Sequence, residues 1–91
     1  MNNDNPPPKI EFPCPDYPIK VLGEATERYR EIVLSVMEIH APDFDIEKIT
    51  IRDSRNGTFQ SVTVFITATG VDQLQAIFDD LKKLPETRMV L

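Results

Sequence analysis

The chain has 91 residues, of which 41% are hydrophobic and 27% are charged, so it can bury one modest globular core. Its net charge of -5 repels nucleic-acid backbones and anionic lipid surfaces, which argues against both as partners. No apolar run approaches the ~20 residues of a membrane span, and the first residues lack the basic and apolar regions of a secretory signal, so we expect a cytoplasmic protein.

Residues 1–10 contain asparagine, aspartate and three consecutive prolines, which predicts a disordered, partly polyproline tail. Residues 11–91 are then expected to form a single domain. The stretch FPCPDYP at its start carries Pro13, Pro15 and Pro18, and each proline removes a backbone donor. We therefore expect this stretch to be extended and to pair only at a sheet edge.

Residues 17–23, YPIKVLG, predict the first strand. Ile19 and Val21 fall on one face of this strand, and Lys20 and Leu22 fall on the other. Gly23 is expected to end it.

Residues 24–42 show helical spacing, with Thr26 as the expected N-cap and Pro42 as the stop. The apolar stripe of this helix follows steps of three and one, and comprises Tyr29, Ile32, Val33, Val36, Met37 and His40. Such a stripe predicts one helix face packed on a sheet.

Residues 45–55 predict a second strand with Ile49 and Ile51 facing the core. The dipeptide Asn56–Gly57 predicts a two-residue type I′ hairpin turn, in which both residues have positive φ. Counting outward from that turn places Ile51 opposite Val62. The apolar faces of the two strands then coincide, so the turn and the hydrophobic pattern agree.

The third strand lies within FQSVTVFITATG. Val62, Val64 and Ile66 alternate along its core face, whereas Phe59 and Phe65 fall on the opposite face. This strand has a complete core face and also carries two phenylalanines on its other face. We interpret that other face as a sheet surface that the helices do not cover.

A second helix begins at Thr69 or Gly70 and ends before Pro85, and TRMVL forms a last strand. The apolar stripe of this helix comprises Val71, Leu74, Ile77, Phe78 and Leu81. The order β-α-β-β-α-β predicts an α+β, ferredoxin-like sandwich: a four-stranded antiparallel sheet, strand order 4-1-3-2, with both helices on one face.

Four segments in this order, FPCPDYPIKVLG, HAPDF, SRNGTFQSVTV and the terminal RMVL, resemble the YbeD family of small bacterial proteins. The resemblance covers about residues 11–91. It implies the same ferredoxin-like fold, similar to the ACT-type regulatory domains of amino-acid metabolism. It implies no catalytic residues, because that family has no settled activity. The longer proline-rich segment before Glu11 departs from the family pattern.

Acylphosphatases share this topology, and their phosphate loop follows the first strand and ends in an arginine. Here VLGEATERYR offers Gly23 and then Arg28 or Arg30, but Glu24 and Glu27 stand where a phosphate would bind. The second strand also lacks the asparagine of that site. Because function is argued from the site and not from the fold, we predict that the protein is not an enzyme.

The single cysteine and the single histidine form no nucleophile pattern. Cys14 has no second cysteine for a disulfide, and we interpret it as a reduced thiol without a role. His40 lies near a helix C-terminus, where the dipole favours positive charge, and we interpret it as structural.

An alternation of acids resembles part of a calcium loop. Asp43, Asp45 and Glu47 have the right spacing, but Lys48 replaces the required glycine and Ser54 replaces the final glutamate. We therefore predict a solvated acidic loop, no metal site and no cofactor.

RNA-recognition domains share the topology and stack bases on aromatic residues of the third strand. The two stacking aromatic residues of RNA-recognition domains are separated by one residue. Phe59 and Phe65 are farther apart along the strand and so cannot form that platform. With the negative net charge, this predicts no nucleic-acid partner.

Two functions remain. The first is a non-enzymatic regulatory or protein-interaction module that binds a protein partner, or a second copy, through the uncovered sheet face. The candidate residues are Lys20, Leu22, Phe59 and Phe65, with Phe65 expected beside Leu22, and Val90 as a further member. The competing interpretation is that these are scattered exposed apolar residues, which are normal on any surface.

The second function is an ACT-like sensor of a small molecule such as an amino acid. The ligand would bind where the first strand turns into the first helix, at Gly23, Glu24 and Ala25. ACT domains often carry a Pro-Gly pair there, which this chain lacks. The competing interpretation is that Gly23 serves a turn that needs an unusual φ.

Overall fold

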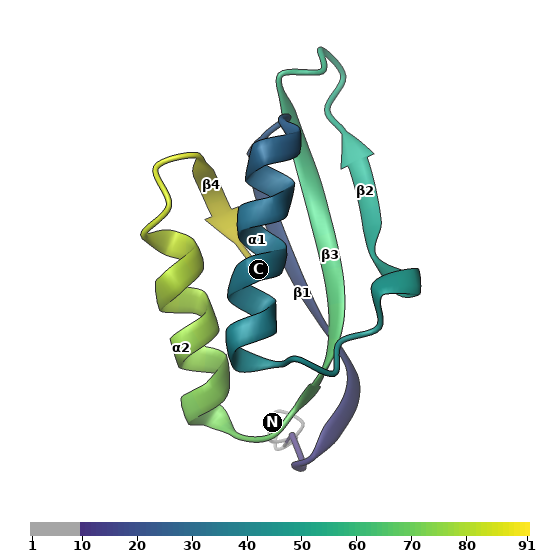
Figure 1. The fold of residues 1–91 in the computed structure, drawn as a ribbon, viewed down its shortest axis with the longest axis vertical. Helices are drawn as coiled ribbons and strands as arrows, with labels where there is room; N and C mark the ends of the chain where they lie inside the picture. The colour runs from purple at the N-terminus through teal and green to yellow at the C-terminus, as the bar shows by residue number, and fades with distance from the viewer. Residues whose placement is uncertain (1–9) are drawn as a thin grey trace, which may run out of the picture.

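In the computed structural model, which describes residues 10–91, strand β1 (Cys14–Glu24) leads into helix α1 (Glu27–His40). A 3₁₀ turn η1 (Ile46–Lys48) precedes strand β2 (Thr50–Asp53), and strand β3 (Phe59–Ala68), helix α2 (Val71–Lys82) and strand β4 (Thr87–Val90) follow (Figure 1). The predicted element order is confirmed. The expected disordered tail at residues 1–10 lies, except for Ile10, outside the described residues.

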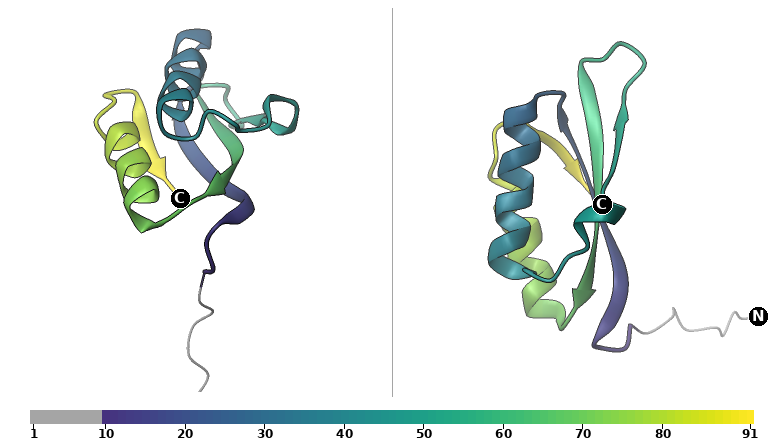
Figure 2. Two further views of the ribbon diagram at one scale, coloured as in Figure 1. Left: turned by 60° about the horizontal axis from the view of Figure 1, so that its bottom comes forward. Right: turned by 45° about the vertical axis from the view of Figure 1, so that its right-hand side comes forward.

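The strands form one antiparallel sheet in the order β2-β3-β1-β4, which is the predicted order 4-1-3-2. Both helices lie on the same face of this sheet, as the right-hand view of Figure 2 shows. The chain therefore has the α+β, ferredoxin-like fold expected from its sequence. Within residues 10–91 no helix lies on the opposite side of the sheet, and we call that side the open face.

The core lies between the helices and the sheet. It is built from alternate residues of β1 and β3 and from one stripe of each helix, as periods of 2 and 3.6 require. Its buried apolar members are Ile19, Val21, Tyr29, Val33, Val36, Met37, Ala41, Val62, Val64, Ile66, Ala68, Leu74, Ile77 and Leu81. Val71, expected in the second stripe, is instead 68% exposed, because it opens α2 at the edge of the helix layer.

Strand β1 begins three residues before the predicted strand. Cys14 pairs with Ala68 of β3, and the register then shifts at a bulge containing Asp16, whose φ is 56°. On its other side β1 pairs with β4 only from Lys20 onward. The proline-rich stretch therefore does pair where β1 is an edge strand, as expected from its missing backbone donors.

The β2–β3 hairpin has the predicted register with a different turn. Ile51 pairs with Val62, as counted from the sequence. However, the N–H of Gly57 donates to the carbonyl of Ser54 at 3.0 Å, and among the described residues of the loop only Gly57 has a positive φ, at 72°. The predicted type I′ turn at Asn56–Gly57 is thus wrong. The loop joins Ser54 to Phe59 and keeps the same midpoint, so the register is unchanged.

Strand β2 is shorter and more exposed than predicted. The carboxylate of Asp45 accepts the N–H of Glu47 at 3.0 Å, so this segment begins the 3₁₀ turn η1 in place of a strand. Ile51 faces the helix side of the sheet but stays 46% exposed. In Figure 1 both helices are displaced towards β4, which leaves β2 uncovered.

Candidate functional site

The register places the four predicted interaction residues on the open face. Lys20 pairs with Thr63, and Phe59 and Phe65 lie on the same face as Thr63 because they also occupy odd-numbered positions of β3. Leu22 pairs with Met89 of β4 on this same face. The face is thus mixed, with a polar centre at Lys20 and Thr63 and apolar groups around it.

Phe65 does not lie beside Leu22, contrary to the expectation from sequence. Phe65 pairs with Pro18, whereas Leu22 pairs with Ser61. The two side chains are therefore separated by four residues along the strands, or about 13 Å. The register between β1 and β3 determines this separation. It does not follow from knowing only that both residues lie on the open face.

The apolar residues at the β4 edge differ from the prediction. Val90 pairs with Val21 and packs against the core, so it does not belong to the open face. Met89 and Leu91 take its place and are 50% and 62% exposed. Leu91 exchanges two backbone hydrogen bonds with Lys20, at 2.7 and 3.2 Å. We call Leu22, Met89 and Leu91 the β4-side strip.

Phe59 lies under a cation. The guanidinium carbon of Arg88 is 5.1 Å from the centroid of the Phe59 ring, within the range of a cation–π contact. Arg88 reaches the ring from β4, across β1, where Glu24 is paired with Phe59. This end of the open face therefore combines an aromatic ring with a positive and a negative group.

Gly23, predicted as part of a ligand turn, lies within β1 and is buried. A Cβ atom at this position would lie 2.3 Å from Cε2 and Cζ of Tyr29. Its φ is not in the positive range, so the expected unusual backbone at Gly23 is wrong. The residue is glycine because the Tyr29 ring packs directly on its backbone.

The Tyr29 hydroxyl joins α1 to β4 through a 2.7 Å hydrogen bond with the hydroxyl of Thr87. Burial raises the pKa of Tyr29, the hydrogen bond with Thr87 opposes this effect, and the carboxylate of Glu86 adds to it. The phenol therefore stays neutral at physiological pH and keeps this contact.

Gln60 is a fully buried polar residue at a core-facing position of β3. Its Nε2 donates to the carbonyls of Glu24 at 3.1 Å and Thr26 at 3.2 Å. Its Oε1 accepts a hydrogen bond from the guanidinium of Arg30 at 3.1 Å. The amide thus fixes the β1–α1 turn, which contains Ala25. Sequence reasoning missed this role, although a glutamine in phase with Val62 was the available signal.

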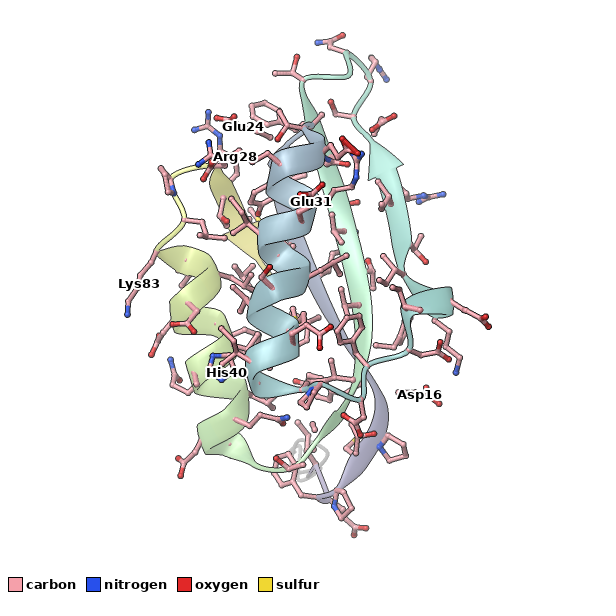
Figure 3. The ribbon with its side chains drawn as sticks, viewed as in Figure 1. Asp16, Glu24, Arg28, Glu31, His40 and Lys83 are labelled. Atoms are coloured by element: carbon pink, nitrogen blue, oxygen red, sulfur yellow. The ribbon has the colours of Figure 1, made fainter. Side chains whose placement is uncertain are left out.

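A groove of about 380 Å³ lies between α1 and β2, on the helix side of the sheet. Its apolar lining includes Leu34, Ile46, Ile49 and Ile51, and its rim on α1 carries Glu27, Arg30 and Glu31. In Figure 3 Glu31 lies on the side of α1 that faces the β2–β3 hairpin. This groove was not predicted, because the sequence does not show how far the helices shift towards β4.

His40 joins the two helices. Its Nε2 lies 2.6 Å from Oδ2 of Asp80, and Nε2 of Gln73 donates to its carbonyl at 2.9 Å. Both contacts tie the end of α1 to α2, as the position of His40 in Figure 3 illustrates. These partners support the structural interpretation of this histidine.

Within residues 10–91 the structure brings together no group of three His, Cys, Asp or Glu side chains suited to a metal ion. In that same part of the chain, no helix is long and apolar enough to cross a membrane.

The element order and the sheet topology define a small α+β domain of the ferredoxin-like kind. The chain belongs to the family described as "Protein of unknown function (DUF493)", whose model matches residues 7–91. A UPF0250 protein of Pseudomonas aeruginosa is 54% identical over 88 residues, which is 97% of this chain and 95% of that relative. The predicted relationship to the YbeD family is thereby confirmed at the level of the family.

Solved structures with the same fold include protein HP0495 from H. pylori, with a TM-score of 0.77 and 22% identity over 100% of this chain and 94% of that one. The ACT domain from the GTP pyrophosphokinase of Chlorobium tepidum has a TM-score of 0.56 and 21% identity, over 81% of this chain and 91% of that one. Both comparisons concern the fold and leave the function to be argued from the surfaces.

Proposed function

We propose that this protein is a non-catalytic regulatory module that binds a protein partner, or a second copy of itself, through the open face of its sheet. The observation that carries the proposal is the β4-side strip. Two of its three side chains are at least half exposed, on a sheet face that neither α1 nor α2 covers. Contiguous exposed apolar groups with a polar surround are the usual composition of a protein contact.

Phe59 and Arg88 support the same surface. Aromatic and arginine side chains supply a large share of the binding energy in protein interfaces. Their stacking already orders both groups at one end of the open face, which lowers the entropy lost on binding.

Met89→Lys is expected to weaken association through the open face by roughly tenfold or more, because it places a charge at the centre of an apolar contact. The measurement compares the wild-type protein with this variant by sedimentation velocity and by affinity capture. Val71→Lys is the matched control, since Val71 is a similarly exposed apolar residue on the helix side. Equal association of all three proteins would contradict the open-face proposal.

The second candidate is the ACT-like sensor, with Gly23, Glu24 and Ala25 around a small molecule such as an amino acid. The structural likeness to an ACT domain favours it. We rank it second because the Tyr29 ring covers Gly23, and Gln60 occupies the carbonyls of the turn.

A ligand of the native state must raise the melting temperature. If the turn is a sensor site, at least one amino acid, added at a concentration well above the Kd of its complex with the protein, should raise the melting temperature of the wild type. Glu24→Lys should then abolish that shift. A flat response across all amino acids would count against the sensor and leave the open-face proposal untouched.

A further inference from the structure

The groove between α1 and β2 lies on the opposite side of the sheet from the open face, and the proposed function does not use it. Ile46 is 67% exposed at its outer side, next to the half-exposed Ile51. Leu34 and Ile49 continue this surface inward until it joins the core. A recessed apolar surface that reaches the core is typical of a site where an apolar side chain inserts.

The rim of this groove is acidic. Glu27 and Glu31 lie one helical turn apart on α1, so both carboxylates border the same stretch of the groove. Within residues 10–91 neither of them forms an ion pair. The intervening Arg30 donates inward to Gln60, and the chain as a whole is negative. The groove therefore favours a positively charged partner.

On the other side of the groove, two further acids lie next to Ile46 in the sequence. Asp45 and Glu47 flank Ile46 in and before η1. Lys48 at the end of η1 is turned to Asp16, with its Nζ 3.0 Å from the carboxylate oxygen. A second copy of this chain would bring like charges together in the groove, so self-association is disfavoured here.

We propose that this groove binds an amphipathic helix of a partner protein that carries lysine or arginine residues one turn apart. The wall from Glu27 to Leu34 spans two helical turns, or about 10 Å, which matches a short helix lying along α1. Such a helix continues the helix layer over β2, which α1 and α2 leave uncovered. Its apolar residues fill the groove at positions i, i+3 or i+4, and i+7.

An added strand fits this surface less well. A strand paired to the outer edge of β2 would lie beyond Ile51 and leave the groove between Ile49 and α1 unfilled. Strand β2 has only four residues, so it offers few free backbone groups to such a partner. The apolar surface and the acidic rim both lie over the sheet, where a helix packs.

The test uses the full chain and a displayed library of peptides with a fixed helical apolar stripe and random residues on the flanking faces. The expected result is enrichment of peptides with lysine or arginine four residues apart. A selected peptide should bind Glu31→Lys roughly tenfold more weakly than wild type, and Ile51→Asp should weaken it similarly. Asp79→Lys makes the same charge reversal on α2 and should bind as the wild type does.

Met89→Lys separates the two surfaces, because a peptide held in the groove should bind this variant unchanged. Melting curves by circular dichroism check that each variant is folded. We expect Glu31→Lys and Ile51→Asp to fold, because Glu31 and Ile51 are both exposed. The proposal is overturned if no peptide is enriched above background. It is also overturned if selected peptides bind the wild type and Glu31→Lys equally, or if Ile51→Asp instead abolishes self-association.

Discussion

Gly23→Ala is expected to destabilise the protein by about 3 kcal/mol, at the upper end of the usual cost of overpacking. The new Cβ would meet the Tyr29 ring at 2.3 Å, so one of them must move. The ring cannot move freely, because it is fully buried and its hydroxyl is bonded to Thr87. Urea denaturation should show a lower midpoint with an unchanged slope.

Gly70→Ala is the control for this measurement. A Cβ at Gly70 would meet nothing within 4 Å, and its φ of 170° is extended backbone that alanine adopts. We expect this variant to lie within about 0.5 kcal/mol of the wild type. If the two alanine variants were equally stable, the steric account of Gly23 would be wrong.

A double-mutant cycle tests whether Tyr29 is the residue that constrains Gly23. Removing the ring with Tyr29→Ala should abolish most of the additional cost of Gly23→Ala, because the two groups are in direct contact. Additive costs would show that Gly23 is constrained by something other than Tyr29. The cycle also bears on the sensor hypothesis. If the contact with Tyr29 accounts for the cost of Gly23→Ala, packing explains the glycine without a small-molecule site.

The fold could be predicted from sequence because its signals are local and agree with one another. The alternation of Val62, Val64 and Ile66 defines the core face of β3, and a turn centred between Asn56 and Gly57 fixes its pairing with β2. The predicted turn type was wrong, but the predicted register was right. Register depends on the midpoint of the loop, whereas turn type depends on the φ of single residues.

The surfaces were less predictable because they depend on contacts between distant residues. Gly23 was explained by backbone conformation, but its actual constraint is the Tyr29 ring, which only packing reveals. Val90 was expected on the open face, but it pairs with Val21 and so shares the core face of β1; the sequence of the last strand does not show this pairing.

The groove shows the same limit for whole elements. Hydrophobic stripes specify which side of each helix is buried, but not where the helix lies across the sheet. Ile46 and Ile51 have the apolar character of core residues, and they stay exposed because both helices are displaced towards β4. An excess of isoleucine near an edge strand was the only available signal for this surface.

Gln60→Leu is expected to cost about 3 kcal/mol, although it places an apolar residue of similar size at a core position. The amide holds three groups: the carbonyls of Glu24 and Thr26 and the guanidinium of Arg30. Leucine would remove this partner from all three. The carbonyls of Glu24 and Thr26 would keep only the backbone N–H groups of Thr26 and Arg30, and polar groups next to a core that lose a hydrogen bond are expensive. Thermal and urea unfolding measure the loss.

Gln75→Leu makes the same substitution on the exposed surface of α2, where the amide donates to the carboxylate of Asp79, and should change stability by less than about 0.5 kcal/mol. Hydrogen exchange then locates the effect. In Gln60→Leu the amide of Ala25, which donates to Thr58 at 3.2 Å, should lose protection with the first turn of α1, while α2 keeps its own. Uniform loss of protection would mean that Gln60 supports the whole core. Unchanged stability would mean that water replaces the amide, and that the β1–α1 turn is open enough to admit a ligand after all.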